Sequence, residues 1–155
     1  MGDPARVLVS ACLLGNPVRY DGAAKTLEHP VLDRWIREGR VVPVCPEMLG
    51  GLPTPRPAAE ISATGAVMDS TGQDVTEAYR AGADAALALA QAQACVAALL
   101  TDGSPSCGAK TIHDGSFSGQ RIPGQGLAAR RLCAAGIPVF TQSEIAKLES
   151  FLRSL

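Results

Sequence analysis

Short apolar runs alternate along the chain with segments whose apolar residues recur at helical spacing. Four runs have the length and composition of buried strands, and they cover residues 6–12, 40–45, 95–103 and 137–141. Helical spacing predicts helices over residues 30–38, 75–94 and 127–135, and a last helix that carries apolar residues from Ile145 to Leu155. This alternation predicts an α/β fold, a single-domain, Rossmann-like open sheet of about four parallel strands flanked by helices.

Residues that favour helix ends place several of these boundaries. Pro30 suits the first turn of the helix that it opens, and Gly39 suits the position just past its end. Asp74 and Glu77 resemble a capping box at the start of the long Ala-rich helix. Ser143 is expected to cap the last helix. The apolar face of the first helix is predicted to consist of Leu32, Trp35 and Ile36.

Three segments between the regular elements lack a simple period. Residues 46–60 contain four prolines and two glycines, which predicts a loop with neither a helix nor a central strand. Residues 60–72 indicate a small hairpin insertion that turns at Thr64-Gly65. Residues 103–126 are predicted to form a long loop, and a loop of that length inside a compact domain is more often functional than not.

Composition narrows the classes of function. The chain has 155 residues, 46% apolar and 19% charged, which indicates an ordinary globular protein with one domain over residues 1–155. The net charge is −1 and no block of Lys or Arg occurs, so the sequence gives no strong signal for binding nucleic acid or an anionic membrane. No apolar run approaches the roughly 20 residues of a membrane span, and the N-terminus lacks the basic region of a signal peptide. The predicted location is the cytoplasm.

Three of the five cysteines occupy one kind of position. Cys12 and Cys45 end the first two predicted strands, and Cys107 follows the third. Because the carboxyl ends of parallel strands share one edge of a sheet, these cysteines could converge there. Cys95 starts the third strand at the opposite edge and Cys133 lies within a helix, so both are expected to be small buried apolar residues. The odd number of cysteines and the missing export signal argue against a disulfide framework.

The three converging cysteines leave several interpretations open. They could be packed thiols, or they could share zinc or iron–sulfur iron, which soft thiolates bind well. Three thiolate ligands would leave the fourth tetrahedral position of a metal open. An open coordination position suggests a catalytic site rather than a purely structural one. His113 could be a fourth ligand, a base or simply an exposed residue. The alternatives from other classes are a structural Cys3His zinc protein without catalysis and a Cys107 nucleophile with His113 as its base.

Four motifs identify a resemblance to a known family. They are SACLLGNPVRYDG (10–22), VCPEMLGGLPTPRPAAEI (44–61), SPSCG (104–108) and DGSFSG (114–119). They resemble the DUF523 family, which includes the 2-thiouracil desulfidases, and the match extends over nearly the whole chain. The resemblance implies a [4Fe–4S] cluster held by Cys12, Cys45 and Cys107, with one iron left open to take the substrate sulfur. The implied reaction replaces C=S by C=O and releases sulfide without net electron transfer.

The resemblance also suggests roles for other residues. It makes Glu47 the general base that activates water, although Glu47 could be a solvated loop carboxylate. Ser104 would position the water or hydrogen-bond the base, or simply form the turn before Pro105, and Ser106 could donate to a cluster sulfur. The implied partner is a small thiolated pyrimidine, present as a free base, a nucleoside or an RNA-borne nucleotide, and the oligomeric state stays open. Residues that could contact substrate, order loops or cover the site are Tyr20, Asp21, Arg56, Asp114, Ser116 and Ser118.

Overall fold

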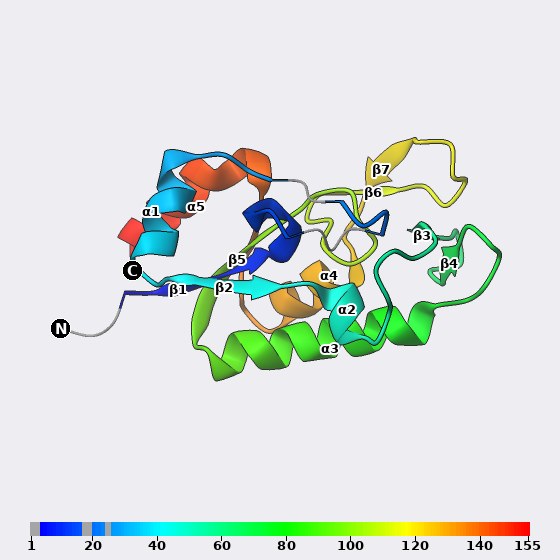
Figure 1. The fold of residues 1–155 in the computed structure, drawn as a ribbon, viewed down its shortest axis with the longest axis horizontal. Coiled ribbons are helices and arrows are strands. Elements are labelled where there is room, and N and C mark those ends of the chain that lie inside the picture. The colour runs from blue at the N-terminus through cyan, green and yellow to red at the C-terminus, as the bar shows by residue number, and fades with distance from the viewer. Residues whose placement is uncertain (1–3, 17–19, 24–25) are drawn as a thin grey trace.

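Four parallel strands form the central sheet of the protein, in the order β2-β1-β5-β8. A computed structural model describes residues 4–16, 20–23 and 26–155 (Figure 1). The strands are β1 (Arg6–Ser10), β2 (Val41–Val44), β5 (Cys95–Leu100) and β8 (Val139–Thr141). The predicted α/β class and open parallel sheet are confirmed.

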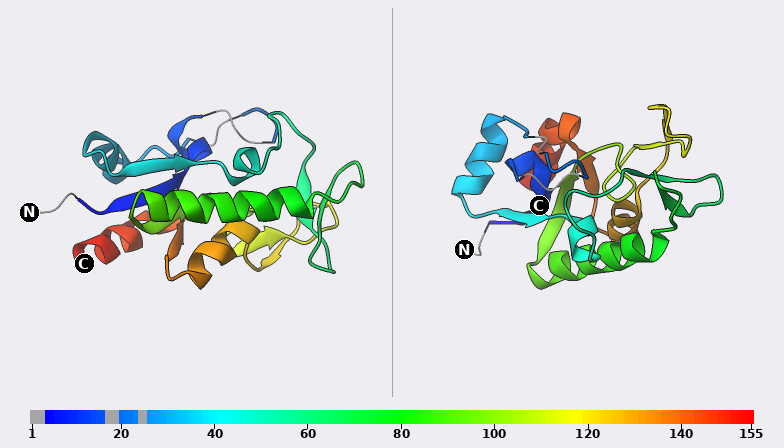
Figure 2. Two further views of the ribbon diagram at one scale, coloured as in Figure 1. Left: turned by 90° about the horizontal axis from the view of Figure 1, so that it is seen from below. Right: turned by 45° about the vertical axis from the view of Figure 1, so that its right-hand side comes forward.

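Helices cover both faces of this sheet, as Figures 1 and 2 show. The helices α1 (Pro30–Arg37) and α5 (Ile145–Arg153) lie on one face, and α3 (Thr76–Ala92) and α4 (Leu127–Ala134) lie on the other. Along β1, Val7 and Val9 pack with Trp35 of α1, whereas Leu8 packs against the Ala-rich α3. No helix in the described part of the chain has both the length and the apolarity needed to cross a bilayer.

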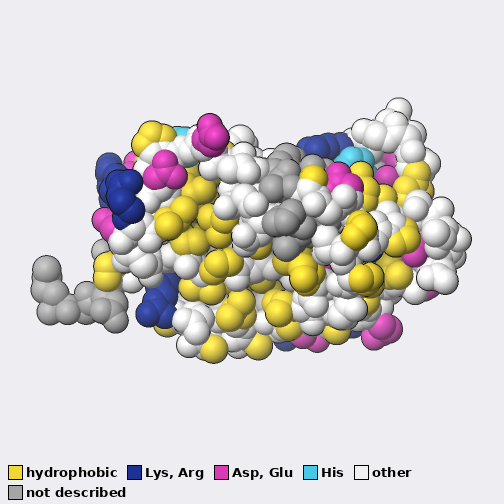
Figure 3. Space-filling model, viewed as in Figure 1, with side chains coloured by type: hydrophobic (Ala, Val, Ile, Leu, Met, Phe, Trp, Pro, Cys, Tyr) yellow, Lys and Arg dark blue, Asp and Glu magenta, His cyan; other side chains and the backbone are white. Residues whose placement is uncertain are grey.

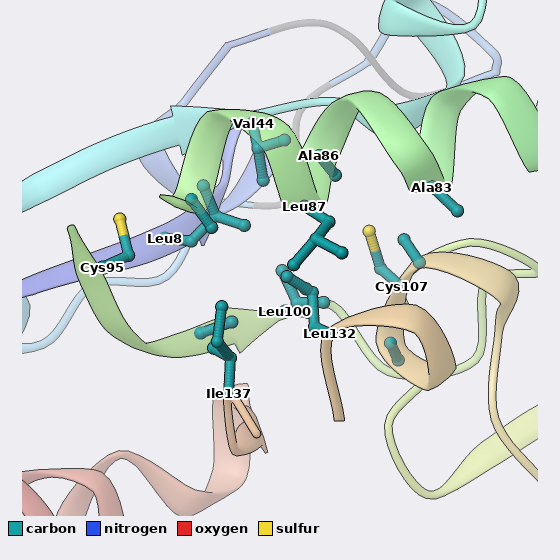
Figure 4. Packing of buried hydrophobic residues seen from close by; sticks show 14 residues of the cluster. Leu8, Val44, Ala83, Ala86, Leu87, Cys95, Leu100, Cys107, Leu132 and Ile137 are labelled. Carbon is teal, nitrogen blue, oxygen red and sulfur yellow. The ribbon is translucent and has the colours of Figure 1, made fainter. Parts of the chain in front are cut away.

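Small side chains bring α3 close to the sheet. Ala83, Ala86 and Ala90 are buried against Leu8 and Leu100, as the composition of this helix predicts. Figure 4 shows Cys95 and Cys107 at opposite ends of this cluster. The two cysteines therefore share a core but belong to opposite ends of the sheet.

Two hairpins and a short helix extend the fold beyond the sheet. The predicted hairpin is present as β3 (Ala59–Ile61) and β4 (Val67–Asp69). The segment predicted to be one long loop contains a second hairpin, β6 (Thr111–His113) and β7 (Arg121–Pro123). The segment after β2, predicted to be free of helix, forms the one-turn α2 (Pro46–Leu49). Pro46 stands at the first helical position, where its missing N–H costs nothing.

Several predicted helix ends differ in detail. α1 begins at Pro30 as predicted, but Ile36 is 48% exposed, so only Leu32 and Trp35 of its predicted apolar face are buried. The Asp74–Glu77 capping box is wrong, because Asp74 Oδ1 accepts from the backbone N–H of Thr76 and no reciprocal bond forms.

The start of the last helix also differs from the prediction. A short 3-10 turn, η2 (Gln142–Glu144), precedes α5. The capping box there joins Thr141 and Glu144, so Thr141 rather than Ser143 is the cap. Ser143 instead pairs its hydroxyl with that of Thr141 at 2.9 Å.

Close contact between α2 and α3 depends on two glycines. A Cβ at Gly82 would collide with the carbonyl oxygen of Pro46, and a Cβ at Gly50 would collide with that of Ala78. α2 can therefore lie directly on the backbone of α3 only while both positions lack a side chain.

We predict that Gly82→Ala lowers the free energy of unfolding by about 1–3 kcal/mol, because the added methyl group must push α2 away from α3. Ala81→Ser, at the exposed neighbouring position, adds one heavy atom to the same helix without touching α2 and serves as the control. Denaturant unfolding monitored by circular dichroism measures both. Equal stabilities for the two variants would contradict the close packing of α2 on α3.

Candidate functional site

The strand order creates a crevice at the carboxyl ends of the central strands. From β1 the chain crosses to β2 on one side, and it later returns past β1 to β5 on the other. Open α/β sheets bind ligands at such a reversal. Cys12 lies in the 3-10 turn η1 (Ala11–Leu14) after β1, Cys45 directly follows β2, and Cys107 lies in the loop after β5. All three cysteines line one cavity of about 220 Å³.

Hydrogen bonds tie the ends of β1 and β5 together at this cavity. Ser10 Oγ accepts from the backbone N–H of Thr101 at 3.0 Å, and Cys12 Sγ lies 3.0 Å from Thr101 Oγ1. The Ser10 side chain also hydrogen-bonds the Cys107 thiol. These contacts fix the positions of Cys12 and Cys107 relative to each other.

Burial makes two of the thiols difficult to ionise. Desolvation, assisted by the neighbouring Glu47 carboxylate, raises the pKa of Cys45 to about 11. Desolvation also raises the pKa of Cys107 well above its usual range, and Glu47, Cys12 and Cys45 add to this effect by repulsion. The sulfurs are therefore close enough to repel one another when ionised. Three thiolates are stable here only beside a ligand that brings positive charge.

Glu47 is held in the cavity wall by an ion pair. Its Oε2 lies 3.6 Å from Nη2 of Arg56, and the two side chains are 10% and 5% exposed. The same carboxylate oxygen accepts from Cys45 Sγ at 3.5 Å. Arg56 also donates to Thr54 Oγ1 at 3.0 Å and hydrogen-bonds the buried Tyr79, whose pKa is raised chiefly by desolvation. Glu47 is thus a buried and paired carboxylate, not the solvated loop residue of the alternative interpretation.

Ser104 forms the turn that presents Cys107. Its Oγ accepts from the backbone N–H groups of Cys107 at 2.7 Å and of Ser106 at 3.1 Å. A hydroxyl that accepts two hydrogen bonds still has one proton to donate, and Ser104 lines the cavity. Ser106 Oγ is buried and has no hydrogen-bond partner among the described residues. Ser104 therefore supports the turn, and Ser106 carries an unused donor beside Cys107.

The two hairpins contribute Glu60, His113 and Arg121 to the cavity wall. His113 and Arg121 are paired across β6 and β7, so their side chains lie on the same face of the hairpin. His113 Nδ1 lies 3.0 Å from the carbonyl oxygen of Gly103, which can only accept, so Nδ1 carries a proton in this contact. Figure 3 shows basic, acidic and histidine side chains gathered over β6 and β7. His113 is half-buried, so the interpretation as an exposed residue is wrong.

Comparison with known proteins places the chain in a family. The family model described as 2-thiouracil desulfurase matches residues 7–144. The chain belongs to the 2-thiouracil desulfurase family. A solved structure named [4Fe-4S]-dependent thiouracil desulfidase TudS is 44% identical, with a TM-score of 0.94 over 97% of this chain and 99% of that chain. The uncharacterized protein YbbK of Bacillus subtilis (strain 168) is 38% identical over 148 residues, 90% of this chain and 97% of YbbK. The resemblance drawn from the motifs is confirmed.

Some residues of this desulfurase family member for which the sequence predicted a role or a burial state lie away from the cavity. Cys95 is buried at the start of β5, as expected. Cys133 is exposed, so its prediction as a buried residue is wrong, because α4 turns this position away from the sheet. Asp21 is also exposed and accepts from the backbone N–H of Ala23. Tyr20 and Arg56, by contrast, line the cavity.

The segment after β6 forms a turn with its own hydrogen bonds. Asp114 Oδ1 accepts from the backbone N–H of Ser116 at 2.9 Å, and the Ser116 and Ser118 hydroxyls pair at 2.6 Å. None of these three residues lines the cavity as described. Their side chains therefore serve the turn rather than the site.

Sequence reasoning missed six polar residues of the cavity wall. Each stands in or beside a motif, but none has a residue type and spacing that would single it out before folding. They are Ser10, Glu60, Tyr79, Thr101, Asp102 and Arg121.

We predict that thiol alkylation of the metal-free protein at pH 8 labels Cys133 much faster than Cys45. A rise of the pKa of Cys45 from 9.0 to about 11 leaves about 100-fold less reactive thiolate at that pH, and Cys133 is exposed. Peptide mass spectrometry over time measures both rates.

Glu47→Gln should accelerate the labelling of Cys45, because removing the carboxylate removes a contribution that raises the pKa of this thiol. The labelling of Cys133 provides the internal control and should not change. A Cys45 rate that is unaffected by the substitution would be inconsistent with electrostatic contact between Cys45 and Glu47.

Proposed function

We propose that this chain is a [4Fe–4S]-dependent thiouracil desulfidase, in which Cys12, Cys45 and Cys107 hold the cluster. The observation that carries the proposal is that three cysteines from three separate strand ends line one cavity together with Glu47. Family membership and the likeness to the TudS structure support the same activity.

The donor set fits such a cluster. Thiolates are the ligands that iron–sulfur clusters take, and three of them leave one iron without a protein ligand. The buried thiols have raised pKa values, so ionising them costs free energy. A cationic metal group would offset this cost of ionisation. The Ser106 hydroxyl next to Cys107 has no partner among the described residues, and it could donate a hydrogen bond to a cluster sulfur.

Glu47 is the proposed general base. When bound, the cluster would supply a Lewis-acidic iron for the thiocarbonyl sulfur. Glu47 then accepts a proton from the water that attacks the thiocarbonyl carbon, and the proton later goes to the departing sulfide. Substrate and water thereby give the oxo product and hydrogen sulfide, with no change of oxidation state. Arg56 holds the carboxylate in place for this transfer.

Ser104 is proposed to act in the same step. The Ser104 oxygen accepts hydrogen bonds from two backbone N–H groups of the turn. The hydroxyl proton therefore points away from the turn. That proton can be donated to the attacking water or to the Glu47 carboxylate. Ser104 would thus both position Cys107 and order the reacting groups.

The alternatives explain the site less well. The likeness to the TudS structure, named as [4Fe-4S]-dependent, and the match to the desulfurase family favour an iron–sulfur cluster over a structural zinc site. A lone Cys107 nucleophile is disfavoured because burial raises its pKa well above the usual range.

The cavity and the cysteines support a proposal for the size of the substrate and for the location of the protein. The thiouracil reacts in a cavity of about 220 Å³, which favours a small thiolated pyrimidine over a large nucleic acid. All five cysteines are free, which supports a reducing compartment such as the cytoplasm.

The cluster assignment is tested by anaerobic reconstitution with iron and sulfide analysis. The wild-type protein should be brown and bind about four irons per chain. Cys12→Ser, Cys45→Ser and Cys107→Ser should each abolish the cluster, whereas Cys95→Ser and Cys133→Ser should retain it. A colourless wild-type protein that cannot be reconstituted, or a full cluster in Cys107→Ser, would falsify the assignment.

Measurements of turnover together with iron content or stability distinguish the roles of Glu47 and Ser104. Glu47→Gln should retain the iron content yet lower kcat for 2-thiouracil by about 100-fold or more, because no base remains. Ser104→Ala should lower kcat and also reduce stability by about 1 kcal/mol, because two backbone N–H groups lose their acceptor. Ser104→Thr keeps the hydroxyl and should restore both properties. If Ser104→Ala changes stability alone, the residue serves only the turn.

A further inference from the structure

We propose that Glu60 and Arg121 select uracil-type substrates by reading the ring edge formed by N3–H and the C4 carbonyl. This inference rests on the proposed function and adds the residues that determine specificity. In a 2-thiouracil, N3–H lies beside the thiocarbonyl carbon and donates, whereas the C4 oxygen accepts. A site that recognises this edge needs an acceptor and a donor, and the cavity wall contains both in Glu60 and Arg121.

Glu60 provides the acceptor. It lies on β3, is 8% exposed and lines the same cavity as the three cysteines. Its Oε1 accepts from the backbone N–H groups of Gly115 at 3.0 Å and of Phe117 at 3.1 Å, which fixes the carboxylate. Oε2 has no partner among the described residues. An anionic oxygen that no protein donor occupies is free to accept a hydrogen bond from a ligand N–H in this cavity.

Arg121 provides the donor. It lines the cavity from β7, and it forms no ion pair or hydrogen bond with any residue that the structure describes. Its guanidinium lies over Gly103, where a Cβ would stand 2.9 Å from Cζ of Arg121. Gly103 thus leaves room for a planar group that presents several N–H donors at the cavity wall.

The polarity of this pair distinguishes two classes of base. Uracil-type rings present a donor at N3 and an acceptor at C4, which complement Glu60 and Arg121. Cytosine-type rings present an acceptor at N3 and an amino donor at C4, which would face like groups in the site. A site built around buried hydrogen bonds discriminates strongly against a ligand that leaves them unpaired. We therefore expect 2-thiouracil to be a far better substrate than 2-thiocytosine.

Glu60→Gln is the sharpest test because it changes polarity without changing shape. The Gln carbonyl oxygen can still accept from Gly115 and Phe117, while its amide group turns a donor toward the cavity. In the reconstituted enzyme the substitution should lower kcat/KM for 2-thiouracil by about 10- to 100-fold. It should also shrink the preference for 2-thiouracil over 2-thiocytosine by at least about 10-fold, because the new donor suits N3 of the cytosine-type ring.

A binding measurement on the same proteins is independent of turnover. Isothermal titration of the reconstituted enzyme with uracil and with cytosine should show tighter binding of uracil in the wild type and a reduced preference in Glu60→Gln. Arg121→Ala, at an exposed position that tolerates substitution, should weaken uracil binding by about 10-fold and leave the iron content unchanged. Glu77→Gln, on the exposed side of α3, removes the same charge outside the cavity and should change neither preference.

The possible outcomes separate the inference from the proposed function. If Glu60 only anchors the loop, its Gln variant should leave the uracil-to-cytosine preference unchanged, and this result would overturn the inference while the desulfidase function stands. Equal use of both thiobases by the wild type would also overturn it. If the loaded wild type converts neither base, the proposed function fails, and the titrations with uracil and cytosine still decide the inference.

Discussion

The parallel pairing of β1 with β2 on one side and β5 on the other is the constraint on which the rest of the site depends. It directs three chain segments out of the sheet at the same edge, and each segment carries one cysteine, directly after β2, two residues after β1 and seven residues after β5. The bonds of Ser10 and Thr101 then lock the two central strand ends at this edge. The cavity is therefore a consequence of strand order, not of any local cysteine motif.

The burial that brings the cysteines together also makes their ionisation unfavourable. The thiols of Cys45 and Cys107 are held neutral by desolvation, and the Glu47 carboxylate beside them makes ionisation still harder. Arg56 offsets part of that charge through its ion pair with Glu47. A cationic cluster would relieve the remainder, so ligand binding and the ionisation of the cysteines are one coupled event. Glu47 stands at the centre of this coupling because it touches both a proposed ligand and Arg56.

Much of the sheet and the meeting of the cysteines could be predicted because both follow from regular periodicity. Apolar runs specify parallel strands, and parallel strands specify a shared edge, so Cys12, Cys45 and Cys107 follow without any tertiary information. The β6–β7 hairpin could not be predicted, since its three-residue strands lie among glycines that mask any alternation. The place of Glu60 and Arg121 in the cavity wall depends on contacts with segments distant in sequence, Gly115 and Phe117 for the former and Gly103 for the latter. The exposure of Cys133 likewise depends on how α4 rotates against its neighbours, which its helical period alone does not specify.

The site thus combines two parts with different physical origins. The strand ends form a floor that the whole core stabilises, so the positions of the cysteines cannot change without cost to the fold. The wall comes from short hairpins that pack on α3 and on each other through Ile61, Val67, Tyr79 and Ile112, and Arg121 of this wall has no hydrogen bond or ion pair with a residue that the structure describes. Glu60 links the two hairpins of the wall, because its Oε1 binds the backbone N–H groups of Gly115 and Phe117 in the loop after β6 while the residue also lines the cavity. The cysteines of the floor can therefore stay the same while substitutions in the wall change which ring edge binds. Such substitutions must keep the hydrogen bonds of residue 60 to Gly115 and Phe117.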